Sequence, residues 1–281
     1  MANEAKRAGV VPRRIHLVVA IDRLLARLLV SAPAGSWVVK GGFANQLRRP
    51  GDARFTEDVD LRVDSTIERA NDLMAAAFAT DLDDLFAYEA PVAATSLGGP
   101  PGGGRQFVVV ARLAGTELVR FKADVSAGDA IVGDTEEHPS DPILERLGYA
   151  PARFPVYPLG QSVAEKIHAL TLPRSAANTR ARDLVDLVWF AQRFGFRSDD
   201  LIDAGRVTFD RRLTHAWPPE VPRVPATWTT AYARFRDEMR LDPATIAEAR
   251  GFVAGFLAPV LAGTGGLAWD PAERRWTPAS A

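Results

Sequence analysis

Two acidic residues spaced two apart are the first feature of this sequence that could do chemistry. Asp58 and Asp60 lie in residues 58–63, where polar and apolar residues alternate as they do in a β-strand. Residues two apart share one face of a strand, so we expect both carboxylates to project together. Neighbouring carboxylates repel each other unless a cation lies between them. The oxygen-preferring cation Mg²⁺ would meet that need.

A lysine and two glycines precede these acids at a position that is typical of an anion site. Lys40, Gly41 and Gly42 follow the short apolar run 37–39 and precede a helix-like segment at 43–49. Backbone N–H groups of a glycine turn at a helix N-terminus bind anions. A triphosphate is the natural occupant of such a turn beside Mg²⁺. The alternative is a tight strand-to-helix turn followed by a solvated acidic strand.

A third carboxylate lies in the apolar-rich run 117–126. Lys122 and Asp124 share one face of this predicted strand, and Phe121 and Ala123 belong to the other. If this strand neighbours the first, Asp124 completes a triad that could hold two metal ions for in-line displacement at phosphorus. The alternative is an edge strand whose charged side chains serve solubility.

Lysine usage points to the same motifs and to a fourth one. Only four of the 34 basic residues are lysines, and apart from Lys6 they are Lys40, Lys122 and Lys166. Arg and Lys are not interchangeable where a point charge contacts a phosphate. Lys166 is therefore a candidate for stabilising a triphosphate and the charge of a transition state.

The fourth motif begins around Lys166, and two more acids follow it along the chain. Asp183 and Asp186 lie three residues apart in the helix-like segment 181–194, so both can face one cleft. A lone Arg-Asp-x-x-Asp is otherwise a solvated helix face.

In this order, the motifs resemble the AbiEii/AbiGii toxin family of nucleotidyltransferases, in the DNA polymerase β-like superfamily. The resemblance extends from about residue 37 to residue 189 and rests on Lys-Gly-Gly-x-Ala, Arg-Phe-Thr-Glu-Asp-Val-Asp-Leu, Lys-x-Asp, Glu-Lys-x-x-Ala-Leu and Arg-Asp-Leu-x-Asp-Leu. It implies a nucleotidyltransferase that depends on Mg²⁺, with Mn²⁺ as an alternative, and that is the toxin of a type IV toxin–antitoxin or phage-defence pair. It also implies an NTP donor, a cognate antitoxin and, in the MenT-like branch, the tRNA 3′ acceptor end as target, which would block translation.

The resemblance also assigns roles to residues of this chain. The expected catalytic residues are Asp58, Asp60, Asp124, Lys166 and Asp183, and the first three of these are the expected metal ligands. The expected nucleotide-binding residues are Lys40, Gly41, Gly42, Thr56, Lys122, Lys166 and Asp186. The choice between Asp183 and Asp186 as the essential distal acid stays open. Gly42 stands where many members of the superfamily have Ser.

Several arginines near these motifs favour an RNA acceptor. Arg48, Arg49, Arg54, Arg180 and Arg182, together with Arg174, suit an RNA backbone better than a small aminoglycoside. Two other acceptors remain open, a small molecule of the aminoglycoside kind and a protein hydroxyl. A catalytically idle binding module is a different class, and the complete set of carboxylates argues against it.

Composition bounds these hypotheses. The 281 residues include no Cys and have a net charge of −1, which excludes thiolate metal sites and argues against a polycation that coats nucleic acid. The nineteen uncharged residues 251–269 hold five glycines and Pro259, so we expect a buried helix that ends near Pro259 rather than a membrane span. The first residues have no apolar core of signal-peptide type, so we expect a cytoplasmic protein, and we expect a monomer.

The elements that must position these residues divide into two parts. We predict an α/β (α+β) fold, with a nucleotidyltransferase-like mixed sheet domain over 1–155 and a helical C-terminal domain over 156–281. The predicted helices are 15–30, 66–85, 162–172, 181–194, 228–240 and 243–257. We also predict a hairpin of strands 106–113 and 117–126, a flexible glycine-rich loop at 98–104 and a proline-rich connection at 217–225.

Overall fold

The computed structural model describes residues 1–98, 101–173 and 180–279, so Arg174 and part of the predicted glycine-rich loop lie outside the described residues. The chain divides into two units. The N-terminal unit comprises Met1–Asp129 and Thr135–Tyr157, and the C-terminal unit comprises Ala130–Asp134 and Pro158–Ala281. The predicted border between residues 155 and 156 lies beside Pro158. That the two parts are separate domains with separate roles remains a proposal.

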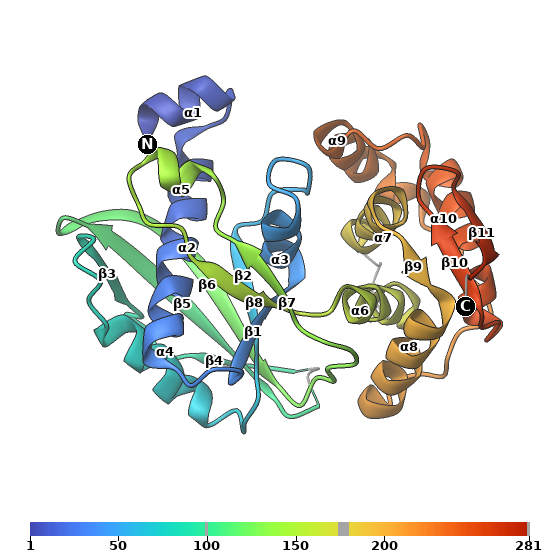
Figure 1. Ribbon diagram of the computed structural model, residues 1–281, viewed down its shortest axis with the longest axis horizontal. Helices are drawn as coiled ribbons and strands as arrows, with labels where there is room; N and C mark the ends of the chain where they lie inside the picture. The colour runs from blue at the N-terminus through green and yellow to red at the C-terminus, as the bar shows by residue number, and fades with distance from the viewer. Residues whose placement is uncertain (99–100, 174–179, 280–281) are drawn as a thin grey trace. The chain divides into compact units, whose positions relative to one another are not determined.

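A mixed β-sheet forms the centre of the N-terminal unit (Figure 1). Its strand order is β3-β5-β6-β2-β1-β8-β7, with β4 beside β5. The strands are β1 (Trp37–Lys40), β2 (Asp58–Val63), β3 (Phe86–Glu89), β4 (Thr95–Leu97), β5 (Gly104–Leu113), β6 (Thr116–Ala127), β7 (Glu136–Pro139) and β8 (Arg153–Val156). The helices are α1 (Ala2–Ala8), α2 (Pro12–Ser31), α3 (Gly41–Arg48), α4 (Arg69–Ala79) and α5 (Ile143–Arg146).

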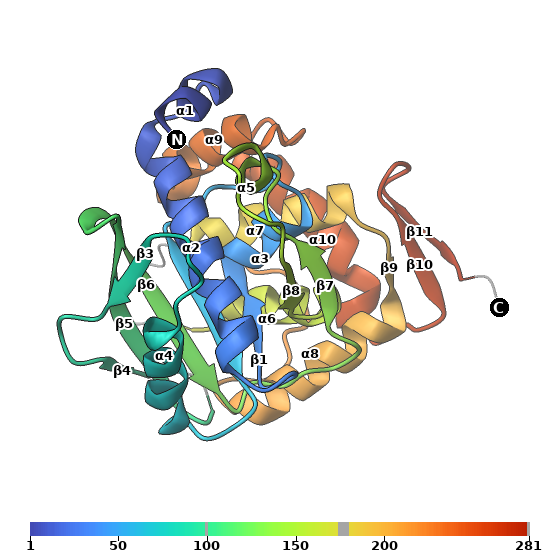
Figure 2. The same cartoon turned by 60° about the vertical axis from the view of Figure 1, so that its left-hand side comes forward.

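One face of this sheet is apolar and is covered by helices. Val59, Leu61 and Val63 of β2 are buried in the same core as the apolar stripe of α2, which includes Leu24 and Leu28. Figure 2 shows α2 crossing the sheet with α4 beside it. The alternation of buried and half-buried residues along β2 leaves its acids for the opposite face. The predicted helix 15–30 and the predicted strand 58–63 are thus confirmed.

The hairpin of β5 and β6 is also confirmed. Ala114 and Gly115 connect the two strands, and both residues have positive φ angles, 49° and 80°. Positive φ at both central positions is the conformation of a two-residue turn that matches the twist of the strands.

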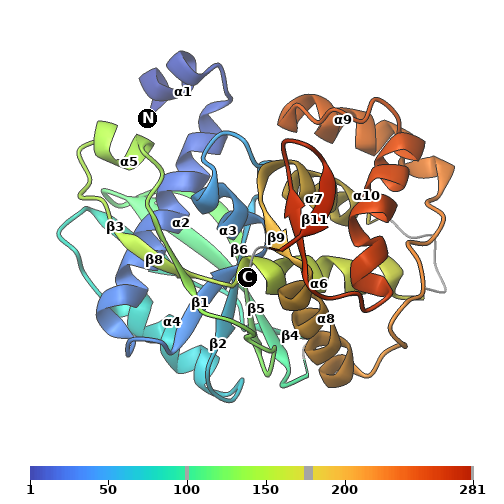
Figure 3. The same cartoon turned by 45° about the vertical axis from the view of Figure 1, so that its right-hand side comes forward.

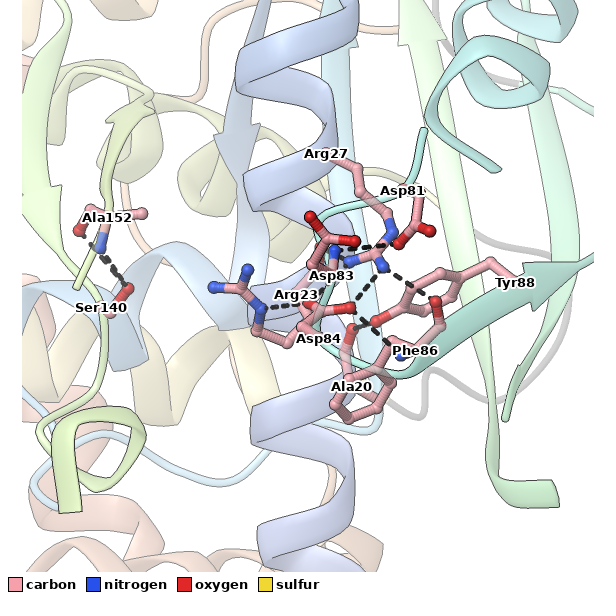
Figure 4. A network of polar contacts seen from close by, with 10 residues as sticks. All are labelled: Ala20, Arg23, Arg27, Asp81, Asp83, Asp84, Phe86, Tyr88, Ser140 and Ala152. Atoms are coloured by element: carbon pink, nitrogen blue, oxygen red, sulfur yellow. Dashed lines mark hydrogen bonds and ion pairs between the residues drawn. The ribbon is translucent and has the colours of Figure 1, made fainter. Parts of the chain in front are cut away.

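The predicted helix 66–85 is wrong at both ends, because α4 covers only Arg69–Ala79. Asp84 lies in the segment between α4 and β3, and its side chain binds two arginines of α2, as Figure 4 shows. Its carboxylate accepts hydrogen bonds from Arg27 at 2.6 Å and from Arg23 at 2.8 Å. Burial alone would raise the pKa of Asp84, but the hydrogen bonds from these two arginines outweigh burial and lower that pKa to about 2.

The C-terminal unit is mainly helical but contains a small sheet that the sequence analysis missed. Its helices are α6 (Leu159–Thr171), α7 (Ala181–Arg193), α8 (Ser198–Arg212), η1 (Ala226–Trp228), α9 (Thr229–Met239) and α10 (Ile246–Leu261). The strands β9 (Phe196–Arg197), β10 (Leu267–Asp270) and β11 (Arg275–Pro278) form an antiparallel sheet. Figure 3 shows the hairpin that ends in β11 beside α10. Trp276 of β11 stacks on Phe256 of α10 at 5.8 Å between ring centroids.

The uncharged segment 251–269 forms the end of α10 and most of β10, with Pro259 inside the last turn of the helix. This agrees with the expected helix end near Pro259. No helix in the described parts of the chain is long and apolar enough to cross a membrane.

Asp22 on α2 is a further buried acid of the N-terminal unit. Asp22 is 1% exposed, and neither of its carboxylate oxygens has a hydrogen-bond partner among the described residues. Burial raises the pKa of Asp22 to about 7, and the nearby Ser140 and Arg23 offset burial only in part, while Asp141 adds to the increase. The folded protein therefore holds this carboxyl protonated in conditions where the unfolded chain ionises it.

We expect Asp22→Asn to stabilise the protein in a pH-dependent manner. An unfolded aspartate ionises near pH 4, whereas folded Asp22 does so near pH 7, so wild-type stability falls as pH rises between these values. The substitution should raise the free energy of unfolding by about 1–3 kcal/mol near pH 8 and change it little near pH 4. Urea unfolding at both pH values measures this, with Asp203→Asn on the exposed face of α8 as control. An equal gain at both pH values would contradict the explanation.

Candidate active site

The predicted neighbourhood of the acidic strands is confirmed. Strand β6 pairs with β2 in parallel, and the register aligns Asp124 with Asp60 and Lys122 with Asp58. Residues in register on neighbouring strands share a face of the sheet. Asp58, Asp60 and Asp124 are all half-buried there, and Lys122 is exposed.

Two further residues extend this arrangement across four strands. Strand β1 pairs antiparallel with β2 and aligns Lys40 with Asp60, and β5 aligns Gln106 with Asp124. Gln106, Asp124, Asp60 and Lys40 thus form one row on the polar face of the sheet, here called the acidic row. Gln106 Nε2 donates a hydrogen bond of 2.9 Å to Asp124 Oδ1, so the amide orients this carboxylate. The sequence analysis did not single out Gln106, because only strand register shows that it neighbours Asp124.

The two glycines permit a close approach of side chains to the turn between β1 and α3. Gly41 has a φ of 66°, and a Cβ atom on it would lie 2.0 Å from Asp60 Oδ2. A Cβ on Gly42 would lie 2.9 Å from the Cβ of Thr56. Any larger residue at position 41 would therefore displace Asp60. Among the residues that the structure describes, no side chain caps the N-terminus of α3, where the turn presents its first amide groups.

Asp129 is a buried acid of this face that the sequence analysis missed. It follows β6 directly after Gly128, and its side chain is only 1% exposed. Its Oδ2 atom lies 2.5 Å from Lys40 Nζ and accepts a hydrogen bond of 2.8 Å from Ser126 Oγ. Lys40, which we expected to contact a nucleotide, is thus held by an ion pair. No sequence spacing pointed to Asp129, because it lies beyond the strand that carries Asp124.

The donor types on this face fit a divalent cation, although a complete ligand set is not assembled. Asp58 and Asp60 offer carboxylate oxygens from one face of β2, and the missing Cβ of Gly41 leaves space beside Asp60. In residues 1–98, 101–173 and 180–279, no three His, Asp or Glu side chains are grouped so that they could hold a metal ion. The predicted triad with Asp124 is therefore adjacent in register, but it is not a preformed cluster.

Two of the predicted RNA-contacting arginines are buried, which corrects that part of the prediction. Arg48 has a side chain that is 1% exposed, and it pairs with Glu136 at 2.9 Å. It also donates hydrogen bonds to Asn45 Oδ1 and to the carbonyl oxygen of Tyr157. Burial lowers the pKa of Arg48, and Glu136 opposes that shift. Arg48 therefore joins α3 to β7 and the end of β8.

Arg54, at 7% exposed, is the second buried arginine, whereas the three others that the structure describes lie at the surface. Arg49 in the N-terminal unit has a side chain that is 44% exposed, and it pairs with Asp52 at 3.6 Å. In the C-terminal unit, Arg180 and Arg182 are exposed. Closeness to a motif in the sequence thus did not predict exposure.

The C-terminal unit brings Lys166 and the two distal acids together. Lys166 Nζ on α6 lies 3.0 Å from Asp183 Oδ1 and 2.9 Å from Asp186 Oδ2, both on α7. The side chain of Asp186 is completely buried, and that of Asp183 is 5% exposed. Arg180 Nε donates a hydrogen bond of 2.6 Å to the other oxygen of Asp183. Both acids thus lie on one side of α7, with Lys166 between them.

Both the sequence and the fold resemble those of known proteins. The family model described as "Nucleotidyl transferase AbiEii toxin, Type IV TA system" matches residues 23–254. No curated protein matches the chain. Among solved structures, MenT4, a nucleotidyltransferase toxin from Mycobacterium tuberculosis H37Rv, is 19% identical, with a TM-score of 0.59 and 98% of both chains covered. JHP933 from Helicobacter pylori is 14% identical, with a TM-score of 0.47, 89% of this chain and 92% of that chain covered.

The likeness to MenT4 supports the fold, and the family model extends over most of the chain, including every motif described above. The α/β architecture and the expected enzyme class are thereby confirmed. This chain belongs to the AbiEii family of nucleotidyl transferase toxins of type IV toxin–antitoxin systems, and it is a nucleotidyltransferase.

Proposed function

We propose that this toxin transfers an NMP from an NTP to RNA, at the 3′ acceptor end of tRNA, in a reaction that requires Mg²⁺ and blocks translation. The acidic row beside the Gly41–Gly42 turn is the observation that carries the proposal. It combines carboxylates for a cation with backbone amides for phosphates on one face of one sheet. Family membership implies the NTP and an antitoxin partner, and we propose that the protein acts as a monomer in the cytoplasm.

Asp58, Asp60 and Asp124 would hold the cation. When bound, Mg²⁺ would neutralise the charge of the triphosphate oxygens. The backbone amides of Gly41 and Gly42 would donate hydrogen bonds to phosphate oxygens. Thr56 lies against Gly42, and Lys122 is in register beside Asp58. In the structure Lys40 is engaged by Asp129, so we assign it a supporting role in nucleotide binding.

The chemical step is displacement at the α-phosphorus of the NTP. The oxygen of an RNA hydroxyl forms the new bond to phosphorus, the bond to pyrophosphate breaks, and the hydroxyl loses its proton. We propose that Asp124 accepts this proton at Oδ2, because its Oδ1 is held by Gln106. Lys166 would stabilise negative charge on the phosphates, and Asp183 and Asp186 would orient its ammonium group.

The proposal is tested by incubating the protein with each of the four labelled NTPs and total tRNA, with and without Mg²⁺. We expect label from one or more NTPs to enter tRNA only when Mg²⁺ is present, and not to enter it with Asp60→Ala. Label in a small molecule or in protein, with none in RNA, would show that the acceptor is not RNA. The enzyme class would be unchanged. Transfer that persists in EDTA would contradict the requirement for a cation.

The exposed and buried arginines should behave differently in tRNA binding. Arg49→Ala should change the free energy of unfolding by less than about 0.5 kcal/mol, because its ion pair is exposed. If Arg49 contacts one phosphate, its loss should lower the slope of log K against log salt by about 0.7–0.9. Unfolding and a salt titration of tRNA binding measure the two effects.

Arg48→Ala is the matched control on the neighbouring position. It leaves Glu136 without its buried partner and should destabilise the protein by about 2–4 kcal/mol. At a temperature where this variant is folded, its salt slope should equal that of the wild type. A flatter slope for Arg48→Ala at unchanged stability would restore Arg48 as an RNA contact.

A further inference from the structure

Asp129 connects the three central strands on which the proposed site depends. Its carboxylate binds Lys40 at the end of β1 and Ser126 near the end of β6. Its carbonyl oxygen accepts a hydrogen bond of 3.3 Å from Arg62 Nε on β2. Lys40, Ser126 and Arg62 lie on the same polar face as the acidic row, and Ser126 and Arg62 are in register with each other. A single residue thus bonds to β1, β2 and β6.

The backbone directly before Asp129 is closely packed against residues 102 and 103. Gly128 has a φ of 76°, and a Cβ on it would lie 2.5 Å from the backbone nitrogen of Gly102. Gly102 in turn donates a hydrogen bond of 3.0 Å to the carbonyl oxygen of Ala127. The chain that leads into Asp129 is therefore held at Ala127 and Gly128, and the carboxylate to which Lys40 binds follows this fixed segment directly.

Lys40 transmits this restraint to the proposed phosphate-binding turn. It is the residue before Gly41, it is in register with Asp60, and its side chain is 11% exposed. Gly41 contacts Asp60 so closely that a displaced turn would also displace this carboxylate. A misplacement of about 1 Å in a catalytic site can reduce turnover by about 100-fold.

We propose that Asp129 is a positioning residue for nucleotidyl transfer. It fixes Lys40 and thereby holds the Gly41–Gly42 turn against Asp60. This inference rests on the proposed function of the acidic row, and it predicts that Asp129 affects turnover through the turn rather than through contact with the substrate.

Asp129→Asn is the informative substitution, because the amide keeps an oxygen for Lys40 and Ser126 but loses the charge. We expect kcat to fall by about 10- to 100-fold while KM for the NTP changes by less than about threefold. Hydrogen exchange in the protein without nucleotide should be faster at the amides of residues 41–43.

Asp84→Asn is the matched control. Asp84 is also a buried acid of the N-terminal unit, with a side chain that is 5% exposed and paired with Arg23 and Arg27. This variant loses a buried charge away from the acidic row, so kcat should stay within about threefold of the wild type wherever the variant is folded. Exchange at residues 41–43 should not change.

Lys40→Met/Asp129→Leu provides a second variant in case Asp129→Asn folds poorly. Removing both members of the ion pair leaves neither charge buried without the other, so this variant should be more stable than Asp129→Asn. Its turnover should still be at least about tenfold below that of the wild type.

The results separate this inference from the proposed function. The positioning role is overturned if the double variant keeps wild-type turnover, if Asp129→Asn keeps its kcat, or if Asp84→Asn loses as much activity as Asp129→Asn. None of these results affects the proposed function, because the wild-type protein still transfers NMP. If the wild-type protein transfers no NMP from any NTP, the proposed function fails, and the positioning role fails with it.

Discussion

Asp60→Ala is expected to abolish nucleotidyl transfer, with kcat lower by about 10³-fold or more, while the protein stays folded. Asp60 lies at the centre of the acidic row, between Asp124 on β6 and Lys40 on β1. It is also the side chain against which the Gly41 turn packs. Removing it takes away a proposed cation ligand and the contact that aligns the turn with the acids.

Stability should not follow activity in this variant. Asp58 and Asp60 share one face of β2, so removing one carboxylate relieves repulsion in the protein without a cation. Urea unfolding should show a free energy equal to or above that of the wild type. Asp72→Ala, on the exposed surface of α4, is the control and should keep wild-type turnover. An Asp60→Ala variant that retains more than about a tenth of wild-type turnover would exclude Asp60 from the chemistry.

The local part of the site was predictable because its signals are local. Asp58 and Asp60 have the period of a strand, and Gly41 and Gly42 mark a turn before a helix. The sequence analysis stated the neighbourhood of β6 and β2 only as a condition, and the parallel pairing of the two strands meets it. Gln106 and Asp129 could not be placed beside the acids in this way. The position of Gln106 depends on the pairing of β5 with β6, and that of Asp129 on contacts with Lys40 and Ser126 beyond the end of β6. No single segment of sequence contains these contacts.

The errors have a similar cause. Arg48 was assigned to a surface because it follows Gly41 and Gly42 by only a few residues, yet α3 turns it inward to Glu136. The sheet of β9, β10 and β11 was missed because strands of two to four residues show almost no periodicity. Helix 66–85 was extended too far because the acids after Ala79 look like a helix surface, whereas Asp84 binds Arg23 and Arg27.

Lys166→Ala is the second substitution with a large expected effect, and it should affect both turnover and stability. The ammonium lies between Asp183 and Asp186, whose side chains are at most 5% exposed. Without it, two buried carboxylates lose their shared partner, which should cost about 3–5 kcal/mol of unfolding free energy. If Lys166 also stabilises charge on the triphosphate, turnover should fall by at least about 10²-fold.

Stability and chemistry can be separated with a variant of the same unit. Trp269 is 5% exposed and donates a hydrogen bond of 2.7 Å to the carbonyl oxygen of Ala191 on α7, so Trp269→Ala should cost about 3–5 kcal/mol as well. Both variants should be assayed at a temperature where unfolding curves show them to be folded. Under that condition Trp269→Ala should turn over at close to the wild-type rate, and Lys166→Ala should not.

Lys166→Arg distinguishes a general need for positive charge from a need for a compact ammonium. Arginine can still pair with Asp183 and Asp186, so stability should recover in large part. The planar guanidinium is longer and cannot occupy the position of Nζ between the two acids, so turnover should remain at least about tenfold below that of the wild type. Full recovery of turnover by arginine, or equal losses in Lys166→Ala and Trp269→Ala, would make Lys166 a structural residue that neutralises the two acids of α7.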